Sequence, residues 1–217
     1  MLHIKQFVFN PFDENTYLVS SDTDGGHDAI VIDPGMYNDA EAKRFDDYVK
    51  ENNLSIKAIV LTHIHLDHCF GAMRLHRLTG APVMASTADA FLSTSLADQA
   101  RRFGLRMGRD EAVSIDTPLH DGDTVAVGSD SLTVLTVPGH SPGGIALYSA
   151  EGGVVFSGDS LFRRSIGRTD LPGGSSRTLV DSVRNRLLSL PPDTLVLPGH
   201  GPSTTVREET LGNPFVR

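Results

Sequence analysis

The first third of the chain alternates short apolar runs with turn-forming residues, and this pattern predicts strands. Three of the runs end at Asn-Pro, Ser/Asp/Gly or Asp-Pro-Gly segments. The fourth is continuous and rich in β-branched residues, as in a fully buried strand. A helix is predicted before this fourth run, because Asn38 precedes a stretch from Asp39 to about Glu51 with apolar residues at helical spacing. The predicted strands are 4–9, 16–19, 29–32 and 56–61.

The rest of the chain continues this alternation, with strands prevailing towards the C-terminus. The stretch 106–116 has no periodic pattern and is predicted to be a surface loop. The predicted helices are one ending at 75–78, then 87–103, about 176–190, and a short one after Thr205. The further predicted strands are 82–85, 124–127, 132–137, 145–148, 154–156 and 194–197.

Two segments, 135–142 and 195–202, have similar sequences, LTVPGHSP and LVLPGHGP. Each has an apolar strand followed by Pro-Gly-His-x-Pro, which hints at an internal duplication. Two similar halves, each a sheet with covering helices, predict an α/β fold, a four-layer αβ/βα sandwich. No linker or low-complexity segment divides the chain, so residues 1–217 are predicted to form a single domain.

The composition narrows the class of protein. Hydrophobic residues make up 39% of the 217, enough for a real core, and the formal net charge is −8 without a block of Lys or Arg. This charge argues against nucleic acid as a partner. Neither a signal-peptide pattern nor a membrane-spanning apolar run is present, and Cys69 is the only cysteine. We therefore expect a cytoplasmic protein without a disulfide or a membrane partner.

The candidate chemistry lies where predicted strands end. The sequence His63-Ile64-His65-Leu66-Asp67-His68 directly follows the apolar run that ends at Leu61 and Thr62. Imidazole and carboxylate groups are ligands for zinc, iron and manganese. Three further candidates, each placed shortly after a predicted strand, are His140, Asp159 and His200.

The HxHxDH motif and the order of the later His, Asp and His resemble the metallo-β-lactamase fold superfamily over nearly the whole chain. The chain is most similar to glyoxalase II-like hydrolases, because position 159 is Asp where β-lactamases with two zinc ions typically carry Cys. It ends at Arg217, so it resembles the short subgroup that lacks the C-terminal helical domain of glyoxalase II. The resemblance implies a first metal site of His63, His65 and His140, a second of Asp67, His68 and His200, and Asp159 bridging both.

This ligand set implies a hydrolase that holds two divalent metal ions, with zinc as the first expectation and iron or manganese as alternatives. Two such ions about 3.5–4 Å apart can share a water, lower its pKa, and direct the bridging hydroxide at a carbonyl carbon. Asp67, the predicted catalytic residue, and Asp159 offset part of the metal charge. The expected substrate is a small thioester, similar to S-lactoylglutathione.

Three residues expected around the site have more than one interpretation each. Asp33 is either a carboxylate that orients a ligand histidine or a turn-forming residue before Pro34. Arg168 stands where glyoxalase II carries a lysine that holds glutathione, so it either binds a substrate carboxylate or pairs with Asp170 to fix the loop. Cys69 is expected to be a buried, inert thiol rather than a ligand or a nucleophile.

Two other enzyme classes remain open, together with a binding protein that kept the fold without the chemistry. The Gly-Arg-Thr-Asp string at 167–170 resembles persulfide dioxygenases of the same superfamily. Such an enzyme would use one iron on His63, His140 and Asp159. A hydrolase of lactones or other esters is the other alternative. The presence of all seven expected ligands argues against the binding protein.

Overall fold

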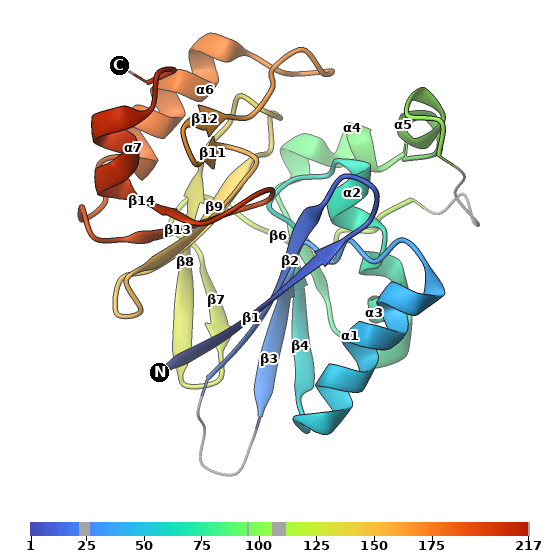
Figure 1. The fold of residues 1–217 in the computed structure, drawn as a ribbon. Helices are drawn as coiled ribbons and strands as arrows, with labels where there is room; N and C mark the ends of the chain where they lie inside the picture. The colour runs from blue at the N-terminus through green and yellow to red at the C-terminus, as the bar shows by residue number, and fades with distance from the viewer. Residues whose placement is uncertain (22–26, 95, 106–111, 217) are drawn as a thin grey trace.

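The computed structural model describes residues 1–217 except 22–26, 95, 106–111 and 217. Two six-stranded sheets face each other, and helices cover their outer faces (Figure 1). This arrangement confirms the predicted four-layer α/β sandwich. Within the described residues, no helix combines the length and the apolar character needed to cross a bilayer.

The first sheet contains six strands in chain order, and their direction changes within the sheet. The first three pair antiparallel, whereas the third to the sixth run parallel, so the fourth strand carries its C-terminal end to one edge of the sandwich. The strands are β1 (Leu2–Phe9), β2 (Glu14–Ser21), β3 (Asp28–Ile32), β4 (Ser55–Val60), β5 (Val83–Ala85) and β6 (Thr117–Pro118).

The second sheet has the order β14-β13-β10-β9-β8-β7. Because β9 is antiparallel to both β8 and β10, and β10 is parallel to β13, the strands β8, β10 and β13 all run in one direction. The strands are β7 (Thr124–Val127), β8 (Asp130–Thr136), β9 (Ile145–Ser149), β10 (Val154–Gly158), β13 (Leu195–Pro198) and β14 (Thr204–Thr205). A short hairpin, β11 (Leu161–Phe162) and β12 (Ser165–Ile166), follows β10.

Side-chain alternation along the strands builds three apolar layers. In β3, Val31 packs towards the outer helices, whereas Ile30 and Ile32 pack between the sheets. In β10, Phe156 packs between the sheets and Val155 faces the helices of the other side. Central strands such as β3 and β10 are therefore buried on two faces, which is why they are near-continuous apolar runs in the sequence.

The helices follow the predicted signals except in one region. The side chain of Asn38 caps the first helix by accepting from Glu41 N at 3.0 Å, and Thr205 caps the last by accepting from Glu208 N at 3.2 Å. The predicted helix 176–190 continues beyond α6 as a π-helical turn, Val183–Leu187. The helices are α1 (Asp39–Glu51), α2 (Leu66–Cys69), α3 (Ala72–Thr79), α4 (Ala90–Ser93), α5 (Leu96–Arg102), α6 (Ser176–Ser182) and α7 (Val206–Gly212).

The prediction of one continuous helix over 87–103 is wrong. The segment contains a 3-10 turn at Thr87–Asp89, then α4 and α5 as separate pieces, with residue 95 outside the described residues. Asp89 is buried, and its carboxylate accepts hydrogen bonds from Ile64 N, Ser141 Oγ and Gly143 N. These tertiary contacts fix the start of the segment in place of a regular helix. Most of the predicted loop 106–116 lies outside the described residues.

Candidate metal centre

The sheet directions explain how distant residues meet. His63 and His65 follow β4, His140 follows β8, Asp159 follows β10 and His200 follows β13. The two sheets join at this edge, where Ile145 N donates to Thr62 O at 2.8 Å. The structure therefore brings all seven predicted ligands to one edge of the sandwich, as the placement after strand ends predicts.

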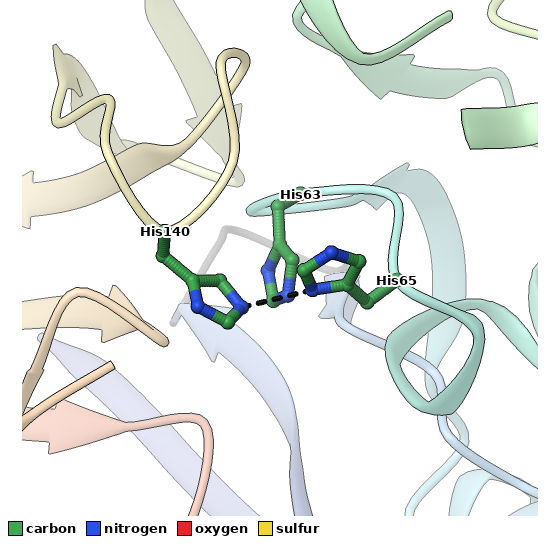
Figure 2. Close-up of side chains that lie close together, drawn as sticks. All are labelled: His63, His65 and His140. Carbon is green, nitrogen blue, oxygen red and sulfur yellow. Dashed lines mark hydrogen bonds between the residues drawn. The ribbon is translucent and has the colours of Figure 1, made fainter. Parts of the chain in front are cut away.

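The candidate ligands form two adjacent groups. In the first, the ligand atoms of His63, His65 and His140 lie within 4.8 Å of one another, and His65 Nδ1 is 2.8 Å from His140 Nε2 (Figure 2). In the second, His200 Nε2 is 3.2 Å and His68 Nε2 3.7 Å from Asp67 Oδ2. Each group offers three nitrogen or oxygen donors, the number that protein metal sites commonly supply.

Asp159 lies between the two groups. Its Oδ2 is 3.5 Å from His140 Nε2 in the first group and 3.6 Å from His200 Nε2 in the second. Its Oδ1 is 3.4 Å from His68 Nε2. Asp159 therefore lies close to candidate ligands of both groups.

Several ligand atoms are buried and lack a hydrogen bond, which tests whether the residues suit a metal. An unsatisfied buried polar atom is destabilising by about 1–3 kcal/mol, so a cluster of them needs a partner. Within the described part of the chain, these atoms are His63 Nε2, His65 Nε2, His68 Nε2 and Asp159 Oδ1. Imidazole nitrogens together with a carboxylate oxygen fit zinc, iron or manganese.

Four of the histidines are oriented through their other ring nitrogen. His63 Nδ1 lies 3.0 Å from Thr62 Oγ1, and His68 Nδ1 lies 3.0 Å from Asp33 Oδ2. Two backbone carbonyls hold the remaining pair: His140 Nδ1 is 2.7 Å from Arg168 O, and His200 Nδ1 is 3.0 Å from Phe12 O. These contacts leave Nε2 of each ring for the metal, as in known metal sites.

Comparison with known proteins identifies the family. A model described as the metallo-β-lactamase superfamily matches residues 9–200. A hydroxyacylglutathione hydrolase, GloC, from Haemophilus influenzae is 37% identical over 222 aligned residues, which cover 99% of this chain and 98% of that protein. The chain belongs to the metallo-β-lactamase superfamily.

Two solved structures of similar proteins share the fold of this metallo-β-lactamase superfamily member. The BLEG-1 B3 metallo-β-lactamase superposes with a TM-score of 0.86 at 35% identity and covers 99% of each chain. TTHA1623, in a di-iron-bound form, superposes with a TM-score of 0.84 at 39% identity and covers 97% of this chain and 99% of the other. Family membership and the histidine-rich cluster together support binding of divalent metal.

Burial sets the charges of the metal-free ligands. Burial and the neighbouring His140 lower the pKa of His65 to about 3, and burial with His68 lowers the pKa of His63 well below its usual value. A neutral imidazole keeps the lone pair that a metal needs. Burial of Asp159 opposes ionisation, but the attraction of His68 and His200 outweighs it and lowers the pKa of this carboxyl. His63 and His65 therefore offer neutral rings, and Asp159 offers a carboxylate between the groups.

The second group has a different charge state. Burial opposes protonation of His68, but the carboxylates of Asp67, Asp159 and Asp33 raise its pKa well above the usual value. The pKa of His200 is also raised, with burial opposed by its hydrogen bond to Asp67 and by the charge of Asp159. The neighbouring carboxylates thus favour protonation of these rings in the metal-free chain, and a metal ion that binds there competes with the proton.

Asp33 is held in a strained backbone conformation that its contacts explain. It has φ 50°, in the left-handed region, and is buried. Its Oδ1 accepts from Thr62 N at 2.7 Å, and its Oδ2 accepts from Thr62 Oγ1 at 2.6 Å and from His68. Of the two interpretations of Asp33, the structure favours the carboxylate that orients a ligand histidine.

We expect Asp33→Asn to weaken metal binding about 10- to 100-fold, the usual effect of changing a group that orients a ligand. Asparagine tolerates the left-handed conformation, so the backbone is retained while the charge opposite His68 is lost. Competition with a chromophoric chelator measures the affinity. Asp46→Asn is the control and should leave affinity unchanged, because Asp46 is a half-exposed residue of α1 that pairs with Arg74 and contacts no candidate ligand. Equal metal affinity in both variants would show that Asp33 does not contribute to metal binding.

Three buried residues near the centre have no recognisable motif in the sequence. Asp89 ties the loop of His63 and His65 to the loop of His140 through its three hydrogen bonds. Glu14 is fully buried, and its Oε1 lies 4.0 Å from His68 Nδ1. Thr62 is bonded to Asp33 and His63.

Gly199 is required where the centre is most crowded. A Cβ at this position would lie 2.7 Å from His68 Cε1 and would overlap Asp159 Oδ1. Only glycine lets the backbone before His200 approach so closely.

Cys69 is buried beside the centre. Its Sγ is 3.9 Å from His63 O, and burial raises the pKa of the thiol. An inert thiol remains our interpretation.

A cavity of about 330 Å³ opens onto the ligands. Five candidate ligands line its floor, His65, Asp67, His140, Asp159 and His200, and its walls are aromatic and aliphatic except for Gln99 and Arg168. Such a pocket, largely apolar with a few convergent polar groups, is typical of a small-molecule site. The wall residues are Phe12, Leu66, Gln99, Phe103, Phe162, Arg168 and Leu171.

Proposed function

We propose that this protein is a thioester hydrolase with two divalent metal ions and that its substrates resemble S-lactoylglutathione. Zinc is the first choice of metal. The observation that carries the proposal is the position of Asp159, whose two carboxylate oxygens lie 3.4–3.6 Å from Nε2 atoms of both ligand groups. A carboxylate shared in this way favours a dinuclear centre. The similarity to a hydroxyacylglutathione hydrolase, at 37% identity, supports the substrate class.

The residues of the chain have distinct tasks in this reaction. His63, His65 and His140 would hold one ion, Asp67, His68 and His200 the other, and Asp159 both. Metal ions held by these residues would supply an activated water and positive charge for the oxyanion that develops on the carbonyl. The carboxylates of Asp67 and Asp159 offset part of the metal charge, and the apolar walls of the cavity exclude bulk water from the thioester.

Metal analysis combined with two assays tests this proposal. Protein reconstituted with excess zinc, manganese or iron is expected to hold about two ions per chain and to hydrolyse S-lactoylglutathione and smaller 2-hydroxyacyl thioesters. Oxygen consumption with glutathione persulfide is the competing readout. One iron per chain, with oxygen uptake and without thioester cleavage, would replace the hydrolase by the dioxygenase. Cleavage of lactones alone would leave the metal centre but change the substrate.

Arg168 contacts both Asp170 and the metal cavity. Its guanidinium forms a bidentate ion pair with Asp170, Nε–Oδ1 and Nη2–Oδ2 both at 2.7 Å, and also lines the cavity. Both side chains are more than half exposed, so solvent screens the pair and it adds little to the stability of the fold. We propose that Arg168 recognises a substrate carboxylate and that Asp170 competes for it.

Accordingly, Arg168→Ala should raise KM for an anionic thioester several-fold with kcat nearly unchanged, whereas Asp170→Ala should lower KM by freeing the guanidinium. Steady-state kinetics on a carboxylate-bearing thioester and on its methyl ester separate the two effects. If both variants instead lower the melting temperature equally and leave KM unchanged, the pair only anchors the loop.

A further inference from the structure

A second cavity, of about 210 Å³, adjoins the metal cavity. The two share four lining residues, His65, Gln99, Phe103 and Leu171. His65 belongs to the first ligand group, so a molecule held at the metals can extend past its ring into the second cavity. We refer to this second cavity as the side pocket.

The walls of the side pocket are apolar. They are formed by Phe91, Leu92, Phe103, Leu171 and Pro172. The polar lining residues are engaged or exposed: Asp98 pairs with Arg101, and Arg102 is exposed. Gln99 is fully used, because its Oε1 accepts from Leu66 N and its Nε2 donates to Leu92 O and Ile64 O. An apolar group gains most from entering such a space.

Both sides of the side pocket are attached to the loops that carry the ligands. Gln99 joins α5 to the backbone of Ile64 and Leu66, next to His65. On the other side, Ser175 N donates to Gly139 O at 2.8 Å, beside His140. The ring of Phe91 lies against Gly173, where a Cβ would be 3.3 Å from its Cζ. The side pocket is therefore preformed together with the metal centre, which favours binding without reorganisation.

We propose that the side pocket binds the acyl chain of the substrate, and this rests on the proposed thioester hydrolysis. The chemical class it would take is a thioester whose acyl group carries an apolar extension, aliphatic or aromatic. The thiol arm would then lie on the other side of the metal cavity, where Arg168 and Phe162 line the wall and the side pocket does not reach. The side pocket is apolar and small, which suits an acyl chain better than a charged peptide.

The test uses thioesters of one thiol with acyl chains from acetyl to hexanoyl and the metal-loaded protein. We expect kcat/KM to rise about three- to fourfold for each methylene that enters the side pocket. Phe91→Ala should reduce the hexanoyl-to-acetyl ratio at least fivefold and leave acetyl hydrolysis unchanged. Phe91 is 48% exposed, so its truncation spares the core, and the remote Phe215, 53% exposed, gives a matched control in Phe215→Ala. A flat series, or a ratio that Phe91→Ala leaves intact, overturns the proposal.

Equilibrium binding provides a readout that does not depend on turnover. Hexanoate should bind the metal-loaded protein more tightly than acetate in titration calorimetry, and Phe91→Ala should remove most of that difference while Phe215→Ala retains it. If no thioester is cleaved, the proposed function fails, and the hexanoate-to-acetate affinity ratio decides the side pocket alone. A loss of the ratio in Phe91→Ala supports it, and an unchanged ratio overturns it.

Discussion

Replacing Asp159 with alanine is expected to lower metal content from about two ions per chain to less than one, and to lower kcat/KM for thioesters by about 10³-fold or more. A 10³-fold loss corresponds to about 4 kcal/mol of transition-state stabilisation. The reason is geometric, because the carboxylate of Asp159 lies against Nε2 atoms from both ligand groups and each group has only three donors of its own. Its removal takes a ligand from both sites at once.

Elemental analysis after dialysis and steady-state kinetics on the same preparation check this expectation. Asp46→Ala provides the control, since Asp46 is a half-exposed residue of α1 that pairs with Arg74. Asp159→Ala also removes a carboxylate that lies beside His68 and His140 in the metal-free chain, which could destabilise the fold. Circular dichroism therefore checks that the variant is folded. A folded Asp159→Ala protein that retains two ions would contradict the bridging position.

The fold could be predicted from the sequence because its signals are local. The helix of α1 begins and ends at the predicted residues, since Asn38 caps it through its own side chain. The position of the ligands at strand ends could also be predicted. A strand buried on two faces is a continuous apolar run, which can be recognised without knowledge of its partner strands. The HxHxDH motif then placed four candidate ligands within one turn-and-helix segment, 63–68.

Contacts between segments distant in the chain could not be predicted from the sequence pattern. The carbonyls that orient His140 and His200 belong to Arg168 and Phe12, and a backbone carbonyl leaves no mark on residue identity. Arg168 illustrates this: its side chain suggests a charged contact, whereas its main chain holds a ligand histidine. Asp89 was equally hidden, because it lies within a run that reads as helix and acquires its donors from the loops 63–65 and 140–144.

The side pocket was not predictable for the same reason. Phe91 and Phe103 lie on a predicted helix where apolar residues read as core, yet they are 48% and 41% exposed and line a cavity. The ring of Phe103 packs against that of Phe12, and the ring of Phe91 lies beside Gly173, so both contact loops rather than the interior of a sheet. Whether an apolar residue is core or pocket wall depends on tertiary packing, which periodicity does not encode.

Substitution of Asp67 distinguishes a centre with two metal ions from a centre with one. Asp67 belongs to the second ligand group alone, and its Oδ2 is 3.2 Å from His200 Nε2. In the dinuclear hydrolase, Asp67→Ala should therefore leave about one ion per chain, held by His63, His65 and His140 with Asp159, and lower thioester turnover about 100-fold. In a mononuclear dioxygenase, which needs only His63, His140 and Asp159, the same variant should retain both its metal and its rate.

Asp67→Asn is the matched variant, because it keeps the size of the side chain and its place in α2 while removing the negative charge. Burial raises the pKa of Asp67, but the attraction of His68 and its hydrogen bond from His200 lower it overall, so the wild-type group is ionised at neutral pH. If the charge is what holds the second ion, both variants lose that ion to the same extent. If Asp67→Ala instead retains two ions and full thioester turnover, Asp67 is not a ligand, and the second group must be redefined around His68 and His200.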